Sequence, residues 1–168
     1  MFAGKTTELI RRLENACAVG VRGVAVKPAA DVRSGAGRMV AHTGQRFDAV
    51  DVTDAASVVT AAADADVLGL DELHFFDTDI ADACRQLADR GTRVIAAGVD
   101  YDERGELFAA TARLLDIADD VTRLTARCTV CGGVARYTQR MVADDARIVV
   151  GGAEAYEPRC AKCFLPKA

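Results

Sequence analysis

The feature that most constrains the fold is the alternation of short, almost wholly apolar segments with stretches of helical periodicity. The apolar segments are of strand length and cover 23–27, 66–70 and 93–99. Apolar residues recur at helical spacing in the stretches 4–19, 55–64 and 77–90. Strands buried on both faces have continuous apolar runs, and strands that alternate with helices form crossover units. The pattern predicts an α/β fold with a parallel sheet.

Two further segments lie between the first two apolar runs. Residues 47–52 are expected to form another strand. Residues 29–46 combine glycines with charged side chains and show no apolar period, so we expect a mobile loop there.

Composition narrows the classes of protein that are possible. The chain has 168 residues, of which 51% are hydrophobic and 27% charged, enough for one packed domain or a domain with a small appendage. No apolar run approaches the roughly 20 residues that span a bilayer, and no basic segment followed by an apolar one precedes the body. We therefore expect neither a membrane partner nor an export signal. A net charge of −4 argues against a general nucleic-acid binder but not against a mononucleotide site.

A phosphate-binding motif begins at the fourth residue. Gly4-Lys5-Thr6 at the start of a helix matches the second half of the loop G-x-x-x-x-G-K-[ST], whose first glycine would precede Met1. In that loop the backbone amides hold phosphate oxygens, the lysine reaches the β- and γ-phosphates, and the hydroxyl binds Mg²⁺. Alone, the motif is equally compatible with an ordinary helix start and a solvated lysine.

Two acids, Asp71 and Glu72, follow the apolar run 67–70. The carboxyl end of a buried strand is where α/β folds bind ligands, and an acid there suits the Mg²⁺-binding aspartate of phosphate-loop enzymes. Together with Gly-Lys-Thr it predicts a nucleoside-triphosphate site. His74 lies close enough to contact phosphate or Mg²⁺-bound water, although simple packing remains an alternative; His42 is expected to be a surface residue.

Four cysteines form two Cys-x-x-Cys pairs, Cys128/Cys131 and Cys160/Cys163. Tetrahedral Zn²⁺ binds four thiolates, which two such turns supply, so a structural zinc site is predicted, with redox disulfides as the alternative. We place a boundary near residue 125, dividing the chain into 1–125 and 126–168, with a β-hairpin over 137–150. Two lone cysteines, Cys17 and Cys84, are expected to be buried on helix faces.

In this order and spacing, the motifs resemble the zinc-containing thymidine kinases of type II, a cytosolic class related to RecA-like ATPases. The resemblance covers nearly the whole chain. Its motifs are the start Met1-Phe2-Ala3-Gly4-Lys5-Thr6-Thr7-Glu8-Leu9, Asp31-x-Arg33, His42-x-Gly44, Asp71-Glu72-Leu73-His74-Phe75-Phe76, Gly98-Val99-Asp100, Arg104-Gly105, Phe108, Leu124-Thr125-Ala126-x-Cys128, Tyr137-Thr138-x-Arg140, Gly151-Gly152, Tyr156 and Cys160-x-x-Cys163.

The resemblance implies a RecA-like α/β domain with a small zinc-ribbon subdomain. It implies transfer of the ATP γ-phosphate to the 5′-hydroxyl of thymidine, giving dTMP, with Glu72 as the general base. The ATP and Mg²⁺ residues would be Gly4, Lys5, Thr6, Thr7, Asp31, Arg33, Asp71 and His74. The thymidine residues would be Met1, Phe75, Val99, Phe108, Thr138, Val149, Gly151 and Tyr156. The family also implies a cytoplasmic homotetramer with no nucleic-acid partner.

Three departures from the family pattern leave alternatives open. His74 replaces a glutamine, and Glu103 replaces an aromatic pocket residue, so another nucleoside such as deoxyuridine remains a possible substrate. The family also has a buried strand and the first loop glycine upstream of the position of Met1; we expect them to be missing here and ATP binding to be weakened. The remaining alternatives are a shortened inactive chain and a zinc-ribbon module that binds nucleic acid or protein.

Overall fold

The parallel sheet is the centre of the molecule. A computed structural model describes residues 1–33, 35–143, 146 and 148–166. Four parallel strands lie in the order β4-β1-β5-β6. Their bounds are β1 Gly23–Pro28, β4 Val50–Val52, β5 Val67–Leu70 and β6 Arg93–Ala96. The α/β class with a parallel sheet is confirmed.

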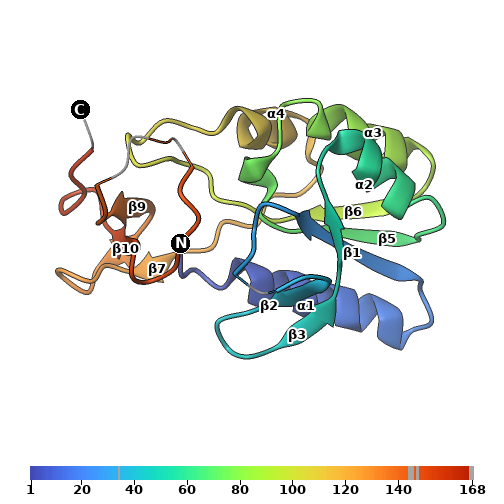
Figure 1. Ribbon diagram of the computed structural model, residues 1–168, viewed down its shortest axis with the longest axis horizontal. Helices are drawn as coiled ribbons and strands as arrows, with labels where there is room; N and C mark the ends of the chain where they lie inside the picture. The colour runs from blue at the N-terminus through green and yellow to red at the C-terminus, as the bar shows by residue number, and fades with distance from the viewer. Residues whose placement is uncertain (34, 144–145, 147, 167–168) are drawn as a thin grey trace.

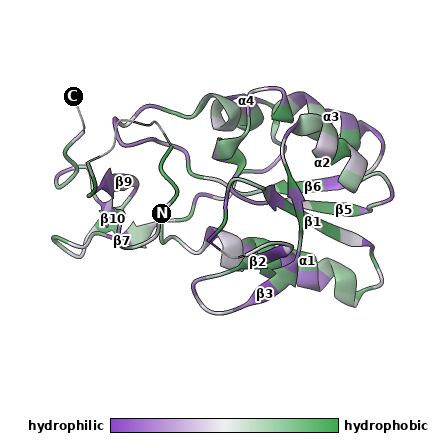
Figure 2. Ribbon diagram, viewed as in Figure 1, coloured by the Kyte–Doolittle hydropathy of each residue, from purple (hydrophilic) through white to green (hydrophobic). Residues whose placement is uncertain are grey.

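Helices cover both faces of the sheet, which gives three layers (Figure 1). Helix α1 (Lys5–Ala18) packs on one face. The other face carries α2 (Ala55–Ala61), α3 (Ile80–Asp89) and α4 (Ala109–Ile117), the last of which the sequence analysis did not predict. A 3₁₀ turn, η1 (Leu73–Phe75), follows β5. Figure 2 shows the hydrophobic residues concentrated in the sheet and its helices, with β5 coloured green along most of its length.

Helix α1 lies close to the sheet because a glycine faces it. Leu9, Ile10 and Leu13 are buried on one side of the helix, at the spacing that an amphipathic helix requires. A Cβ atom added to Gly69 would lie 2.5 Å from Leu13 Cδ1. A larger residue at position 69 would therefore displace the Leu13 side chain or the helix that carries it. Ala16 in the last turn is only half-buried and Cys17 is exposed, so the prediction of a buried Cys17 is wrong.

The opposite face holds the larger part of the core. Val58, Ile80 and Leu87, from α2 and α3, are fully buried with Leu68 and Leu70 of β5. The predicted burial of Cys84 on α3 is confirmed. Asp54 begins α2 with a capping box: its carboxylate accepts from Ser57 N at 2.7 Å, and Ser57 Oγ accepts from Asp54 N at 3.1 Å.

The segment between β1 and α2 is more ordered than the sequence indicated. Residues 29–46 were expected to form a loop, but β2 (Arg38–Val40) and β3 (Arg46–Asp48) form an antiparallel hairpin beside α1. The single strand expected over 47–52 is two strands, β3 and β4, because β3 pairs with β2 whereas β4 pairs with β1. Strands of three residues carry too little periodicity to be recognised.

Strand β6 is more exposed than its apolar sequence indicated. Among the described residues it pairs only with β5, with Leu68 opposite Val94, and its four residues are exposed or half-buried. An apolar run therefore predicted the strand correctly but not its edge position. No helix in the described ranges is long and apolar enough to cross a bilayer.

The C-terminal region consists of two short antiparallel ladders. Strands β7 (Ala126–Arg127) and β8 (Val134–Ala135) pair around the first two cysteines. Strand β9 (Tyr137–Arg140) pairs with β10 (Tyr156–Arg159), so the hairpin expected within 137–150 is wrong in its second strand. Residues 144, 145 and 147 of that expected hairpin lie outside the described residues. The division into folding units at residue 125 stays a prediction.

Candidate active site

The start of α1 forms the floor of the first cavity. Gly4 precedes the helix in the left-handed conformation, at φ +77°, which glycine adopts without strain. The cavity has a volume of about 180 Å³. It is lined by Met1, Phe2, Gly4, Lys5, Thr6, Thr7, Arg33, His42, Thr43 and Glu72. The first turn of a helix offers free N–H groups and a positive dipole end, so this cavity, the phosphate-side cavity, suits an anion.

Thr6 and Asp71 meet beneath the phosphate-side cavity. Thr6 Oγ1 donates to Asp71 Oδ2 at 2.9 Å, which links α1 to the end of β5. Burial, together with the charge of the adjacent Glu72, raises the pKa of Asp71. A hydroxyl and a carboxylate oxygen are suitable ligands for Mg²⁺, which would supply the counter-charge that this buried carboxylate lacks.

Glu72 lies between charged partners in a strained backbone conformation. Its φ of 50° is in the left-handed region, which costs a non-glycine residue roughly 1–2 kcal/mol and occurs preferentially at functional sites. Its carboxylate accepts from Arg33 Nη2 at 2.6 Å. Burial opposes its ionisation, but the positive charges of Arg33 and Lys5 outweigh burial and lower the pKa of Glu72. The carboxylate is therefore ionised at neutral pH.

Arg33 is fixed by a series of ion pairs. Asp31, which is buried, accepts from Arg33 Nε at 2.6 Å and from Nη2 at 2.9 Å. Arg33 Nη1 donates to Gly151 O at 3.3 Å, so the same guanidinium contacts both Glu72 and the C-terminal region. Asp31 was predicted to bind ATP or Mg²⁺, but it does not line the phosphate-side cavity; it holds Arg33.

Lys27 supports this arrangement from within the core and was not predicted. It is the residue before the end of β1, is 2% exposed, and donates from Nζ to Asp31 O at 2.6 Å. It also forms an ion pair with Asp51 Oδ1 at 3.0 Å. A lysine at the end of an apolar strand was the available sequence signal, since lysine is rarely buried without a partner.

A second cavity, the nucleoside-side cavity, brings together all eight residues predicted to contact thymidine. Its volume is about 40 Å³. The predicted residues in its lining are Met1, Phe75, Val99, Phe108, Thr138, Val149, Gly151 and Tyr156. The other residues in its lining are Arg33, Glu72, His74, Tyr101, Asp102, Glu103, Arg140, Ile148 and Val150. Of these, Tyr101, Asp102 and Glu103 follow Asp100 in the chain, and Arg140 lies two residues after Thr138. Ile148 and Val150 flank the predicted Val149.

His74 lies on the nucleoside side and not in the lining of the phosphate-side cavity. Its ring packs against Phe75 and Phe108, with centroids 4.8 and 5.1 Å apart. Its Nδ1 accepts from Val99 N at 3.4 Å. Burial lowers the pKa of His74 to about 4, so the imidazole is neutral at physiological pH. Its predicted contact with phosphate or Mg²⁺-bound water stays a prediction.

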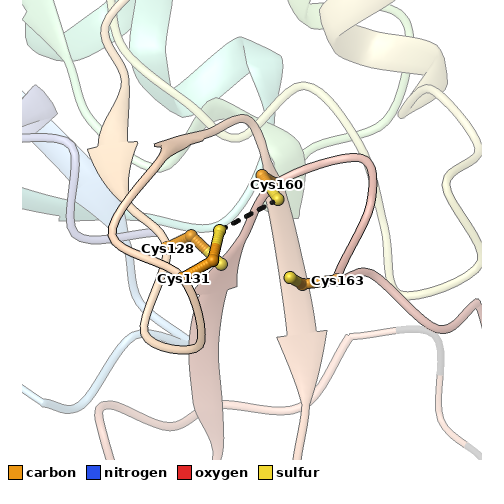
Figure 3. Close-up of side chains that lie close together, drawn as sticks. All are labelled: Cys128, Cys131, Cys160 and Cys163. Carbon is orange, nitrogen blue, oxygen red and sulfur yellow. Dashed lines mark hydrogen bonds between the residues drawn. The ribbon is translucent and has the colours of Figure 1, made fainter.

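The four cysteines of the two Cys-x-x-Cys motifs lie close together, as Figure 3 shows. All four Sγ atoms lie within 4.8 Å of one another, and Cys131 and Cys160 are 3.6 Å apart. Tetrahedral Zn²⁺ with Zn–S bonds of about 2.3 Å places its sulfurs about 3.8 Å apart, whereas a disulfide requires about 2.05 Å. The donor set therefore fits zinc. Four protein ligands leave no open coordination position, which is typical of a structural site.

Fold and site together define a class of protein. A parallel α/β sheet, a helix that begins at Gly-Lys-Thr, and an acid at a strand end bonded to that threonine are typical of phosphate-loop nucleotide-binding proteins. The model of the thymidine kinase family matches residues 1–164. The chain therefore belongs to the thymidine kinase family, whose members are phosphotransferases.

Individual relatives agree with the family match. A thymidine kinase of Coprothermobacter proteolyticus is 45% identical over 95% of this chain and 84% of its own length. One from Pyrobaculum aerophilum is 44% identical over 98% and 94%. One from Rhodothermus sp. is 41% identical over 99% and 78%.

Proposed function

We propose that this chain transfers the γ-phosphate of ATP to the 5′-hydroxyl of thymidine, giving dTMP and ADP. The observation that carries the proposal is that both cavities meet at the same two side chains. Arg33 and Glu72 line the phosphate-side and the nucleoside-side cavities alike. A group-transfer site needs its base and its charge-neutralising group between donor and acceptor.

In this proposal Glu72 acts as the general base. Its carboxylate accepts the proton of the 5′-hydroxyl while that oxygen bonds to the γ-phosphorus and the bond to the ADP oxygen breaks. In the structure described above, Arg33 occupies Glu72 Oε1. Negative charge on the transferred phosphoryl group would attract the same guanidinium, which lines both cavities, and so release the carboxylate for the hydroxyl.

The remaining polar groups bind and orient. Lys5 and the amides of residues 4–7 would hold the phosphates, as their place in the phosphate-side cavity favours. Thr6 and Asp71 would hold Mg²⁺, which neutralises phosphate charge. Zinc at the four cysteines would tie β7–β8 to the end of β10 and so support residues 148–151 in the wall of the nucleoside-side cavity.

The C-terminal region must move to admit a nucleoside. A volume of about 40 Å³ is far below the roughly 300 Å³ of typical ligand pockets. Part of the wall comes from residues 148–151 and Tyr156, whose hydroxyl donates to Val149 O at 2.7 Å. The described residues of this segment, 141–143, 146 and 148–156, we call the lid; it opens for thymidine and closes to exclude water.

The test is phosphorylation of thymidine by ATP in the presence of Mg²⁺. The variant Glu72→Gln is measured in parallel with the control variant Glu106→Gln. Glu106 is exposed and outside both cavities. We expect Glu72→Gln to lower kcat roughly 10²–10⁴-fold and Glu106→Gln to leave it within about twofold. Full activity of Glu72→Gln would refute the assignment of the base. The homotetramer stays a prediction, which light scattering of the purified protein tests.

A further inference from the structure

A buried ion pair joins the α/β part of the molecule to the lid. Glu103 lies between β6 and α4, and Arg140 is the last residue of β9. Arg140 Nη2 and Glu103 Oε2 are 3.1 Å apart, and both side chains are 3% exposed. Both residues line the nucleoside-side cavity. Two charges so fully removed from water stabilise the fold only when they keep a close, hydrogen-bonded geometry. The pair therefore fixes the distance between the two segments of the cavity wall that carry Glu103 and Arg140.

The carboxylate side of the pair is held by a tight turn. Asp102 Oδ1 accepts from Arg104 N at 3.0 Å and from Glu106 N at 2.9 Å. Gly105, at φ +78°, completes the turn in a conformation that favours glycine. Asp102 N donates to Glu106 O at 2.9 Å, which closes the turn. Glu103 therefore projects from a backbone that is fixed on both sides.

The guanidinium side of the pair contacts the lid. Arg140 is opposite Tyr156 in the β9–β10 ladder, and its guanidinium carbon lies 5.8 Å from the centre of the Tyr156 ring. Its Nη1 donates to Ala146 O at 2.6 Å. Arg140 thus touches both the middle of the lid and its last residue, and Glu103 provides its fixed point on the α/β part.

We propose that Glu103 is a positioning residue: by fixing Arg140 it fixes the lid and Tyr156, and so sets the affinity and selectivity of the site for the nucleoside base. This rests on the proposed function, because it assumes that the nucleoside binds in this cavity. The residue is a departure from the aromatic side chain that family resemblance leads one to expect here. Here an ion pair therefore holds these two segments together, where an aromatic side chain would do so by apolar packing.

The test compares Glu103→Gln with Glu103→Asp and the control Glu106→Gln, in the full chain loaded with zinc. Glutamine keeps the shape and removes the charge, so the ion pair that joins Glu103 to Arg140 is lost. We expect the thymidine KM to rise about tenfold or more while kcat stays within about threefold. The ratio of kcat/KM for thymidine to that for deoxyuridine is expected to fall at least about threefold, because a loosened wall discriminates a methyl group less well.

Glu103→Asp keeps the charge and shortens the side chain, so its KM is expected to lie between those of the natural protein and Glu103→Gln. It also serves as the test if Glu103→Gln does not fold, since it keeps a carboxylate opposite Arg140. An unchanged KM and an unchanged selectivity ratio in the folded variants would overturn the proposal. A fall in kcat alone, with KM unaltered, would overturn it as well.

One further variant separates this inference from the proposed function. Tyr156→Leu alters the lid directly, without the ion pair. If it raises the thymidine KM and Glu103→Gln does not, the inference about Glu103 fails and the pocket assignment stands. If neither variant changes the KM, thymidine does not bind in this cavity, and the site assignment in the proposed function is what fails.

Discussion

The α/β part and the C-terminal region are stabilised in different ways. In the first, leucine, isoleucine and valine side chains of α1, α2, α3, β1 and β5 pack together, and nine of them are less than 2% exposed. In residues 126–166, the buried described residues are Cys128, Ala135, Thr138, Arg140, Gly151, Ala155 and Tyr156, mostly small or polar. A region with so little apolar burial needs a metal or other cross-link to be ordered.

The contacts between the two regions are correspondingly specific. Tyr137 stacks on Phe164 at 4.7 Å between ring centres and lies 5.8 Å from Tyr101, which belongs to the α/β part. Arg33 reaches Gly151, and Arg140 reaches Glu103. The α/β part, which we propose holds phosphate, is therefore ordered by its apolar core, whereas the C-terminal region, which we propose covers the nucleoside, depends on a few polar contacts and the cysteines. The two can therefore be perturbed separately.

The largest effect is expected from Cys160→Ser. Zinc at such a site would supply roughly 10 kcal/mol or more of folding free energy. Loss of one thiolate should therefore release zinc and disorder the lid. We expect thymidine phosphorylation to fall at least about 100-fold while the far-UV circular dichroism of the helices persists. Zinc content and limited proteolysis show whether the C-terminal region is lost while the α/β part stays folded. Cooperative unfolding of both regions would show that they are not stabilised separately.

Removal of a buried charge from the α/β part should come next. Lys27→Met leaves Asp51 without its ion pair and frees the Asp31 carbonyl, at a cost of about 3–5 kcal/mol in the free energy of unfolding. Because Asp31 holds Arg33, kcat should fall as well. Urea denaturation and steady-state kinetics measure the two effects. Arg22→Gln, which breaks an exposed pair with Asp66, is the control and should cost less than about 1 kcal/mol.

A cavity in the core should affect stability without affecting the cysteine site. Leu68→Ala removes a fully buried side chain from β5 and is expected to cost about 2–4 kcal/mol. Zinc stoichiometry at a temperature below the transition should be unchanged. A variant that released zinc on this substitution would show that the two regions are more strongly coupled than the contacts indicate.

The helix cap of α2 provides a smaller effect of the same kind. Asp54→Ala removes the acceptor for Ser57 N and should lower the free energy of unfolding by about 1 kcal/mol. Thermal unfolding monitored at the helices is the measurement. No change in thymidine KM is expected, since α2 contributes no residue to either cavity.

The two lone cysteines give the mildest test. Burial raises the pKa of Cys84 to about 11, so at pH 8 its thiol is almost wholly protonated and unreactive. Exposed Cys17 should react with iodoacetamide at native conditions, and Cys84 only after unfolding. Mass spectrometry of the alkylated chain, with Cys17→Ser as the control, distinguishes them.

Much of the site was predictable because its residues sit at positions with a local signature. A few neighbouring residues are enough to indicate the local structure at three places: Gly4 before a helix, Asp71 after an apolar strand, and the Cys-x-x-Cys turns. The pairing of β9 with β10 was not predictable in this way, because 137–150 alternates as well as a hairpin would and the true partner lies beyond it. The small hairpin of β2 and β3 was missed for the opposite reason, since each strand is too short to alternate.

The sequence by itself determined the class of fold, the family, and the residues proposed to hold phosphate and metal. These follow from local periodicity and fixed spacing, which need no knowledge of the chain's path. Only the tertiary structure decided that Arg33 bridges Glu72 and Gly151, that Lys27 is buried beneath Asp31, and that Glu103 pairs with Arg140. Arg33, Glu72 and Gly151, like Glu103 and Arg140, come together from segments far apart in the chain, and Lys27 is buried by such segments. The charge of a side chain alone does not indicate which distant partner the folded chain will bring to it.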